Sequence, residues 1–577
     1  MSNPPPRADS SRHLPLWRLA AMMFIAAWAT GCASLPANTT RVPSTAFNAP
    51  EATALGQLVQ ARRTQASARS DSGFHLLDSV DAAFTSRLAL IEGAQRSLDL
   101  QYYAIHADAS TEILLQRLRD AARRGVKVRL LLDDFNTVGQ DAQVLLLQFE
   151  PNVEIRLFNP LTGSRASLMG RLLGSLHDVP RIQKRMHNKL FLADNALGIA
   201  GGRNLGDAYF GTAEKSNFVD LDVLAWGRIV RDMSASFDHY WNDELAYPVQ
   251  TLLSPDDLAL LRKKASEQAP AAADPSRVGV PQPAAAATLP ATVTVTAGTT
   301  VTATVLPDVT VTAAQTKERP PMDLRRVPLT WAPARLLVDK PDKIGPEDDE
   351  AGASDTVVDG LLALMQQARQ DILIISPYFV PGAQMMQTFA QARARGVRIR
   401  VLTNSLASND APAAHAGYAR YRRDLLGLGI ELYEMRANGQ TAGGLSGSGS
   451  GSRGSWLGSS AGGSKAGASR ASLHSKAVIL DGRLAVIGSM NLDLRSKNLN
   501  SEVALLIRSA ALSREATRLV EDTLAQGAYR VALADGKLLW RAPPGAGYAD
   551  ATDEPEAGTR LKLLVRLLGP LAPDEML

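Results

Sequence analysis

The chain has 577 residues, of which 45% are hydrophobic and 21% charged, so it has enough apolar side chains for sizeable cores. Its formal net charge of +4 falls to +2 without residues 1–31, because 59 basic and 57 acidic residues remain. This near-neutral balance, with only 5% aromatic residues, argues against an extended nucleic-acid-binding surface, which needs clustered positive charge and stacking rings.

The first 31 residues have the pattern of a secretory signal. Three arginines precede an apolar run over residues 19–28, which is short for a membrane span. The single cysteine, Cys32, follows, so no disulfide forms within one chain. Residues 29–32 resemble a bacterial lipobox, which implies that Cys32 is lipidated and becomes the first residue of a membrane-anchored lipoprotein. We expect it on the periplasmic side of the cell envelope, at the outer membrane because Ala33 follows, with an uncleaved anchor as the alternative.

Residues 32–72, rich in Ala, Thr, Ser and Pro, are predicted to form a tether. The first folded segment, residues 73–265, alternates helical and strand patterns. Helices are predicted over residues 81–94 and 109–124, and strands over 97–103, 126–132 and 153–158. This alternation predicts an α/β fold in which a mostly parallel sheet is flanked by helices. The basic stretch over residues 161–186 is interpreted as a surface helix or as a lip that meets anionic lipid headgroups.

A change of composition precedes the second folded segment. Residues 266–330 are mostly Ala, Pro, Thr and Val with little charge, and we predict a disordered insert. Residues 331–577 then repeat the first pattern: residues 121–129 and 392–400 match as a helix, a glycine cap and a strand, which indicates an internal duplication. The Gly/Ser tract over residues 437–472 is interpreted as an inserted loop. The leucine-rich residues 561–571 are expected to lie on a membrane or to pack on the body.

One short motif occurs at corresponding places in the two segments. It reads His187-Asn188-Lys189 with Asp194 in the first copy, and His474-Ser475-Lys476 with Asp481 in the second. Both copies fit His-x-Lys-x-x-x-x-Asp and are followed by an apolar strand, a glycine-containing turn and an asparagine. Because side chains two apart on a strand share a face, each copy presents an imidazole beside an ammonium group. Two such copies placed face to face would form a site suited to attack on a phosphate.

These motifs resemble the phospholipase D superfamily, whose members carry two of them across two fused α/β halves. Residues 201–211, 219–224, 489–496 and 499–502 make the sequence similar, more closely, to the C-type group of bacterial cardiolipin synthases. The resemblance implies an active site at the interface between the halves. It also implies that no cofactor and no metal is needed, because two lysines supply the positive charge.

The resemblance assigns a role to each candidate site residue. His187 is the expected nucleophile and forms a phosphatidyl-histidine, while His474 acts as the acid and then as the base. The expected phosphate-binding residues are Lys189, Lys476, Asn204, Asn491 and Ser489. Asp222 and Glu502 are expected to orient the histidines across the two halves. Asp194 and Asp481 belong to the catalytic motifs but are expected to brace them rather than to react.

The implied reaction transfers a phosphatidyl group to the hydroxyl of phosphatidylglycerol, with phosphatidylethanolamine as an alternative donor. Water as the acceptor would instead give phosphatidic acid, and the motifs do not separate these outcomes. A nuclease of the same superfamily and a lipid-binding lipoprotein without activity are the alternatives from other classes. Whether an accessory protein is needed stays open.

Overall fold

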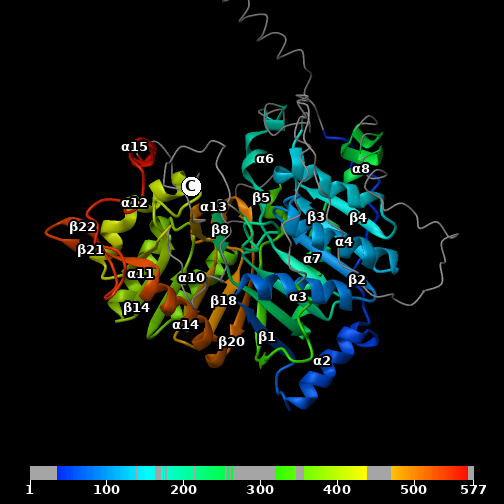
Figure 1. The fold of residues 1–577 in the computed structure, drawn as a ribbon, viewed down its shortest axis with the longest axis horizontal. Coiled ribbons are helices and arrows are strands. Elements are labelled where there is room, and N and C mark those ends of the chain that lie inside the picture. The colour runs from blue at the N-terminus through cyan, green and yellow to red at the C-terminus, as the bar shows by residue number, and fades with distance from the viewer. Residues whose placement is uncertain are drawn as a thin grey trace, which may run out of the picture.

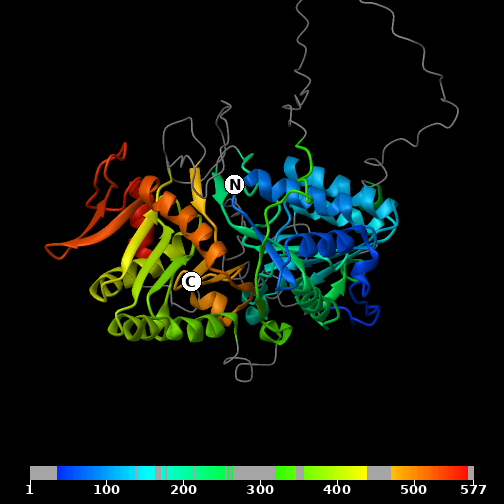
Figure 2. The ribbon, with the colours of Figure 1, turned by 90° about the horizontal axis from the view of Figure 1, so that it is seen from below.

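The computed structural model describes residues 35–137, 139–162, 171–172, 174–175, 178–213, 216–253, 257–259, 261–263, 319–345, 356–437 and 470–569. The predicted signal peptide, Cys32 and most of both predicted inserts lie outside these residues. Figure 1 shows two α/β halves, the first coloured blue to green and the second yellow to red. The two halves also lie beside one another in the perpendicular view of Figure 2.

The first half contains the elements predicted from its alternating pattern, together with several short ones. They are β1 (Ser72–Leu77), α3 (Val80–Gly93), β2 (Ser97–Tyr102), α4 (Ala109–Arg123), β3 (Lys127–Asp133), η2 (Asp134–Asn136), η3 (Gly139–Phe149), β4 (Val153–Phe158), α6 (Val179–Gln183), β5 (Arg185–Met186), β6 (Leu190–Ala193), β7 (Leu197–Gly201), β8 (Ser216–Val219), β9 (Asp222–Gly227), α7 (Arg228–Trp241), β10 (Ala246–Pro248), α8 (Val249–Leu252) and β11 (Thr330–Trp331).

The second half repeats this order. Its elements are β12 (Ala334–Val338), η4 (Pro341–Ile344), α10 (Val357–Gln367), β13 (Asp371–Ile375), α11 (Gly382–Ala394), β14 (Arg398–Asn404), α12 (Pro412–Gly427), β15 (Glu431–Met435), β16 (Arg470–Leu473), β17 (Ala477–Leu480), β18 (Leu484–Gly488), α13 (Leu494–Asn498), β19 (Asn500–Ser501), β20 (Val503–Arg508), α14 (Ala510–Gln526), β21 (Ala528–Ala534), β22 (Lys537–Arg541) and α15 (Thr559–Leu568). The duplicated helix–cap–strand unit is present in both halves, since Gly125 and Gly396 have φ angles of +95° and +82° after α4 and α11.

Within the described residues each half forms one nine-stranded sheet. The orders are β10-β4-β3-β2-β6-β7-β9-β1-β11 and β12-β20-β18-β17-β13-β14-β15-β21-β22. Only β2–β3–β4 and β13–β14–β15 pair in parallel, and the other neighbours in these sheets are antiparallel. The duplicated α/β fold is confirmed, but the prediction of mostly parallel sheets is wrong. The motif strands are the reason: three residues join β6 to β7 and β17 to β18, too few for the crossover that parallel strands need.

The two halves share a hydrophobic core between their sheets. Helices α3 and α4 cover the outer face of the first sheet, and α10, α11 and α12 cover that of the second. The inner faces pack together with α7 and α14, so that Leu192 and Met233 of the first half belong to the same buried cluster as Ile487 and Ala516 of the second. Burying apolar surface across this interface holds the halves in one relative position.

The predicted tether is wrong from residue 35 onward. Residues 35–71 include η1 (Pro50–Ala52) and α2 (Ala54–Gln65), and Leu55 and Val59 of α2 are buried in the first core. Thr53 caps this helix by accepting a hydrogen bond from the Gly56 amide. The apolar positions of α2 therefore make it part of the folded body, a feature that the Ala- and Thr-rich composition concealed.

The chain returns to the first half after the long insert. Residues 319–330 belong to the insert predicted to be disordered, but they pack there: Leu324 and Val327 are buried in the first core, and Trp331 in β11 pairs with Gly73 in β1. The prediction of disorder is therefore wrong for the last part of residues 266–330. The edge of the first sheet is thus closed by residues that precede the second half directly.

Candidate active site

The first motif lies where a short strand of one half meets a strand of the other. Strand β5 pairs in parallel with β19, so that Ser501 lies opposite Met186, and the His187 amide donates a hydrogen bond to the Ser501 carbonyl at 3.0 Å. This pairing places the residue after β5, His187, beside the residue after β19, Glu502. The first histidine therefore meets a carboxylate from the second half.

The second motif repeats this arrangement with the halves exchanged. Strand β16 pairs in parallel with β8, and the His474 amide donates to the Val219 carbonyl at 2.8 Å. The residue that follows β8 is Asp220. Each histidine therefore lies beside an acidic residue of the opposite half, as expected of a duplicated protein whose site lies between its copies.

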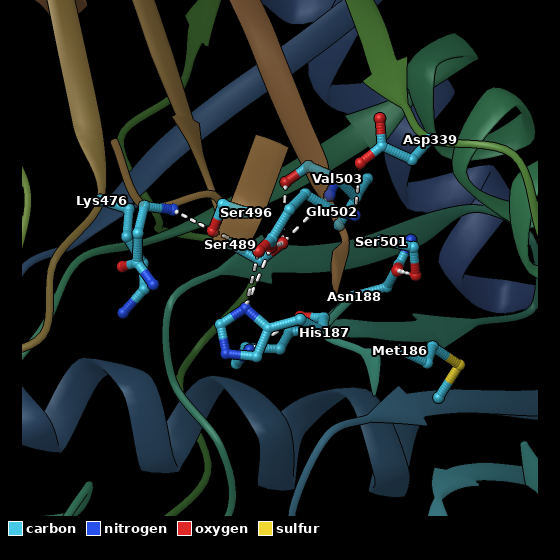
Figure 3. A network of polar contacts seen from close by, with 12 residues as sticks. Met186, His187, Asn188, Asp339, Lys476, Ser489, Ser496, Ser501, Glu502 and Val503 are labelled. Carbon is cyan, nitrogen blue, oxygen red and sulfur yellow. Dashed lines mark hydrogen bonds and ion pairs between the residues drawn. The ribbon is translucent and has the colours of Figure 1, made fainter. Parts of the chain in front are cut away.

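Glu502 holds the His187 ring. The Nδ1 atom of His187 lies 3.0 Å from each carboxylate oxygen of Glu502, and Figure 3 shows the ring below that carboxylate. Ser489 and Ser496 donate their hydroxyls to the same carboxylate at 2.5 and 2.8 Å. Burial raises the pKa of Glu502, but His187 and then Lys189 oppose this, and the net pKa is lowered. An ionised Glu502 keeps the proton on Nδ1 and leaves Nε2 free for chemistry.

Asp220, rather than the predicted Asp222, holds the His474 ring. Its Oδ2 atom lies 2.6 Å from Nδ1 of His474. Register explains the correction: Gly201 pairs with Asp222 and the equivalent Gly488 pairs with Ala504, so the position that matches Glu502 is two residues before Asp222.

Asp222 instead forms a buried ion pair within the first half. Its Oδ2 atom lies 2.9 Å from the Arg87 guanidinium, and the side chains of both residues are 1% exposed. The Oδ1 atom accepts a hydrogen bond from the Arg203 amide. Asp222 therefore connects α3 to β9 and has no contact with His474 among its hydrogen bonds in the described structure.

The two lysines are buried and electrostatically coupled to both histidines. Burial is the largest cause that lowers the pKa of Lys189 to about 7 and that of Lys476 to about 8. Each Nζ atom donates to the carbonyl of the histidine two residues before it, at 2.7 Å for Lys189 and 2.5 Å for Lys476. Among the described residues each of these desolvated ammonium groups has one hydrogen-bond acceptor for its three donors, so both are suited to bind a phosphate anion.

Both imidazoles are neutral in the free site. Burial, followed by nearby positive charge, lowers the pKa of His187 to about 4 and that of His474 well below its ordinary value, although Glu502 opposes the shift at His187. Aromatic rings enclose them: Tyr103 lies 5.1 Å from His187 between ring centroids, while Tyr209 and Phe218 lie 5.3 and 4.9 Å from His474. A neutral imidazole whose Nε2 carries a lone pair is the form that can act as a nucleophile.

The aspartates of the two motifs, Asp194 and Asp481, lie at the far ends of the motif strands. Asp194 and Asp481 brace the motifs as expected, because each accepts hydrogen bonds from three successive backbone amides, residues 95–97 and 369–371 respectively. Both have left-handed φ angles of 52° in the turns after β6 and β17. These aspartates fix the distal ends of the motif strands and have no direct part in the site.

Some of the predicted phosphate-binding side chains already form hydrogen bonds within the protein. Ser489 gives its hydroxyl to Glu502, so it supports His187 rather than pointing a free donor at a phosphate. Asn204 donates to the Tyr209 hydroxyl at 2.9 Å. The Oδ1 atom of Asn491 is buried without a hydrogen-bond partner in the described structure. Both asparagines are buried close to the motifs, at 3% and 4% exposed, and their contact with a phosphate stays a prediction.

Sequence reasoning missed Asp220, Ser496 and the aromatic residues around the histidines. No local signal separated Asp220 from Asp222, because Glu502 directly precedes β20 whereas Asp220 lies two residues before β9, and only the strand register aligns Asp220 with Glu502. The aromatic residues come from loops and short strands, where no periodicity marks them. In the described part of the chain, no group of three or more His, Cys, Asp or Glu side chains has a metal-binding arrangement. No helix there combines the length and apolar character required to cross a bilayer.

Two fused α/β halves that join a pair of His–Lys motifs at their interface define an enzyme of the phospholipase D type. The family model described as "Cardiolipin synthase, PLD-like domain" matches residues 88–241 and 361–524, one region in each half. The chain belongs to this family.

Relatives of known name agree with this membership. The chain is 35% identical to cardiolipin synthase C of Escherichia coli over 464 residues, which cover 80% of this chain and 85% of that protein. It is 23% identical to cardiolipin synthase A of Erwinia tasmaniensis, over 83% and 74% of the two chains. Among solved structures, phosphatidylserine synthase of Haemophilus influenzae has a TM-score of 0.52 at 13% identity, over 89% of this chain and 98% of that one, which shows a common fold.

The pH dependence of the free enzyme follows from the two lysines. A lysine carries its charge below its pKa and loses it as the pH rises, so we expect kcat/KM to fall on the alkaline side, through pKa values of about 7 and about 8. A bound phosphodiester anion raises both values, so the alkaline limb of kcat should lie at higher pH. A pH–rate profile in detergent micelles measures both limbs. A fall in rate on the acid side at the ordinary histidine pKa would contradict the lowered pKa of the two buried imidazoles.

Proposed function

We propose that this enzyme is a transphosphatidylase that passes a phosphatidyl group from one phospholipid to the hydroxyl of phosphatidylglycerol, giving cardiolipin. The observation that carries the proposal is the pair of buried imidazoles, each held through Nδ1 by a carboxylate of the opposite half, with two desolvated lysines acting on both. The cardiolipin synthases named above support the choice of substrate class.

In the proposed first step, Nε2 of His187 attacks phosphorus and the bond from phosphorus to the departing alcohol oxygen breaks. The phosphodiester anion raises the pKa of His474, so Nε2 of His474 takes up a proton from solution when the substrate binds and then donates that proton to the departing oxygen. Lys189 and Lys476 stabilise the charge on the non-bridging oxygens. The result is a phosphatidyl-histidine and a free headgroup alcohol.

In the second step, the hydroxyl of phosphatidylglycerol replaces the departed alcohol. Neutral His474 takes its proton while the oxygen attacks phosphorus, and the bond to His187 breaks. Glu502 and Asp220 keep the two rings in the required tautomer throughout. The buried site, in which His187 and His474 are 8% and 5% exposed, favours a lipid hydroxyl over bulk water as acceptor.

We further propose that Cys32 carries a lipid anchor that holds the enzyme at the periplasmic side of the cell envelope, with the outer membrane favoured. Metabolic labelling with a radioactive fatty acid, compared between the native chain and Cys32→Ser, tests this part alone. Label that persists in Cys32→Ser would contradict it.

We expect cardiolipin to form when the purified enzyme is incubated in mixed micelles with phosphatidylglycerol, with or without phosphatidylethanolamine. Mass spectrometry of the lipids is the measurement, and a His187→Ala/His474→Ala double variant is the control. Cardiolipin that disappears in the control supports the proposal, and its dependence on phosphatidylethanolamine identifies the donor. Phosphatidic acid alone would move the assignment to a hydrolytic phospholipase D. If the folded enzyme forms neither cardiolipin nor phosphatidic acid, both the synthase and the hydrolase assignments are contradicted.

A further inference from the structure

Helix α15 presents a row of leucines that nothing in the described structure covers. Its inner face packs through Val565 against Leu406, next to α12. Its outer face carries Leu563, Leu564 and Leu567, which are 58%, 44% and 59% exposed. Positions i, i+1 and i+4 share one side of a helix, and these three account for half of the six large exposed hydrophobic side chains in the described residues. Clustered exposed leucines mark an interaction surface, whereas scattered ones do not.

The charged residues of α15 itself are all positive. Within residues 559–568, α15 contains Arg560, Lys562 and Arg566 and no acidic residue. Lys562 and Arg566 both approach Asp553, at 3.0 and 3.8 Å, and the Arg566 side chain remains 73% exposed. A short helix with a leucine face bordered by cations has the composition of an interfacial helix that binds anionic lipid surfaces.

The position of α15 connects it to the active site. Leu406, on which α15 packs, lies two residues beyond Asn404 at the end of β14. The Asn404 side chain exchanges two hydrogen bonds of 2.9 Å with the backbone of Leu473, the residue before His474. Figure 1 shows α15 and α6 on the same side of the molecule, one on each half, with β5 and β8 deeper in the body below them. Helix α15 thus lies at the same edge of the molecule as α6, which precedes β5 and His187, and it is linked through Leu406 and Asn404 to the residue before His474.

The start of the described chain lies near α6, on the first half. Asn38 donates to the carbonyls of Glu244 and Ala246, and the neighbouring Leu245 carbonyl accepts a hydrogen bond from the Asn159 amide. The side chain of Asn159 in turn contacts Lys184, directly before β5. Two residues lie between Cys32 and Leu35, so the Cα atoms of Cys32 and Leu35 are at most about 11 Å apart. A lipid on Cys32, which is part of the proposed function, would therefore hold the membrane close to this same edge.

We propose that the outer leucine face of α15 docks on an anionic phospholipid bilayer and, together with the lipid on Cys32, holds the active-site edge at the headgroups. The two contacts lie on different halves of the molecule, so they fix its orientation as well as its distance from the membrane. Two linked contacts also raise the effective concentration of the site at the lipid surface.

The test uses the full chain with Cys32→Ser, so that no lipid anchor contributes. Binding to vesicles of phosphatidylglycerol and phosphatidylcholine is measured by flotation. We expect the triple change Leu563→Ser, Leu564→Ser and Leu567→Ser to raise the apparent Kd at least tenfold, whereas the matched change of an exposed leucine elsewhere, Leu533→Ser, leaves it unchanged. Vesicles of phosphatidylcholine alone should bind weakly, and high salt should weaken binding to the anionic vesicles.

A site-specific label locates the contact. In the Cys32→Ser chain, an environment-sensitive fluorophore at Leu564→Cys should shift to the blue when anionic vesicles are added. The same label at Thr64→Cys, on α2 at the opposite side of the molecule in Figure 1, should not shift. A label at 564 that is already blue without vesicles would show that another part of the chain covers the leucines, and would overturn the proposal.

Two further outcomes show whether a bilayer, a second copy of the chain or nothing binds the leucine face of α15. If the triple variant binds vesicles as well as the native chain does, the leucine face does not dock on the bilayer and the proposal is overturned. If the native chain is a dimer that the triple change converts to a monomer without loss of vesicle binding, the leucine face binds a second copy of the chain instead. Activity on a soluble short-chain phospholipid separates this inference from the proposed function. We expect the triple variant to retain activity on this soluble substrate. If the native chain itself has no such activity, the proposed function fails, but the flotation result still stands.

Discussion

Replacing His187 with Ala is expected to abolish turnover, with kcat lowered by about 10⁵-fold or more, because a nucleophile and its partner base act as a unit in such sites. The fold should survive, since the main chain of His187 keeps its pairing with Ser501 and the carboxylate of Glu502 keeps two serine donors. Lipid product formation is the measurement of turnover, and the thermal unfolding midpoint is the control for the fold.

The change His474→Ala separates the role of nucleophile from the role of acid and base. With a phosphatidyl donor whose leaving group is an activated phenol, His474→Ala should still form the covalent adduct on His187, because such a leaving group needs no proton. The adduct should then persist, since the acceptor hydroxyl has lost its base. Intact-protein mass spectrometry detects it. An adduct in His187→Ala but none in His474→Ala would reverse the assignment, and wild-type turnover in His187→Ala would end it.

The motif side chains that the structure brings together between the halves could be predicted from the sequence because their pattern is local. His187 and Lys189 lie two apart on an extended segment, as do His474 and Lys476, and the repeat of that spacing in two similar halves identified all four. The brace role of Asp194 and Asp481 was equally local, since a turn follows each motif strand. An amphipathic pattern and a glycine cap likewise located α4, predicted over residues 109–124 and observed over Ala109–Arg123, within one residue at both ends.

The features that were predicted wrongly at the site and in the sheets depend on pairing between distant strands. The carboxylate for His474 is determined by the pairing of β16 with β8, segments more than 250 residues apart, and the choice between Asp220 and Asp222 requires that register. The mixed sheets have the same cause, because a strand pattern contains no record of its neighbour's direction. Helix α2 was missed because it contains few large apolar residues, and of these only Leu55 and Val59 are fully buried in the core.

The change Asp220→Asn is expected to lower kcat by about 10⁴-fold while leaving the fold intact. An asparagine at this position can present its NH₂ group to Nδ1 of His474, which favours the tautomer with its proton on Nε2 and removes the charge that stabilises an imidazolium. Burial already raises the pKa of Asp220, but Lys476 and Arg203 oppose that shift. Steady-state kinetics on mixed micelles measure the loss, and Glu502→Gln should behave similarly toward His187.

The matched control is Asp222→Asn, two residues away in the same segment. Asp222 pairs with buried Arg87 and not with a histidine, so its neutralisation leaves a buried guanidinium without its charge partner and should cost about 3–5 kcal/mol of unfolding free energy. Activity per folded molecule should change less than tenfold. Urea unfolding and kinetics together separate the two variants. The reverse pattern, with catalysis lost in Asp222→Asn and stability lost in Asp220→Asn, would show that the carboxylate predicted from the motif alone orients His474 after all.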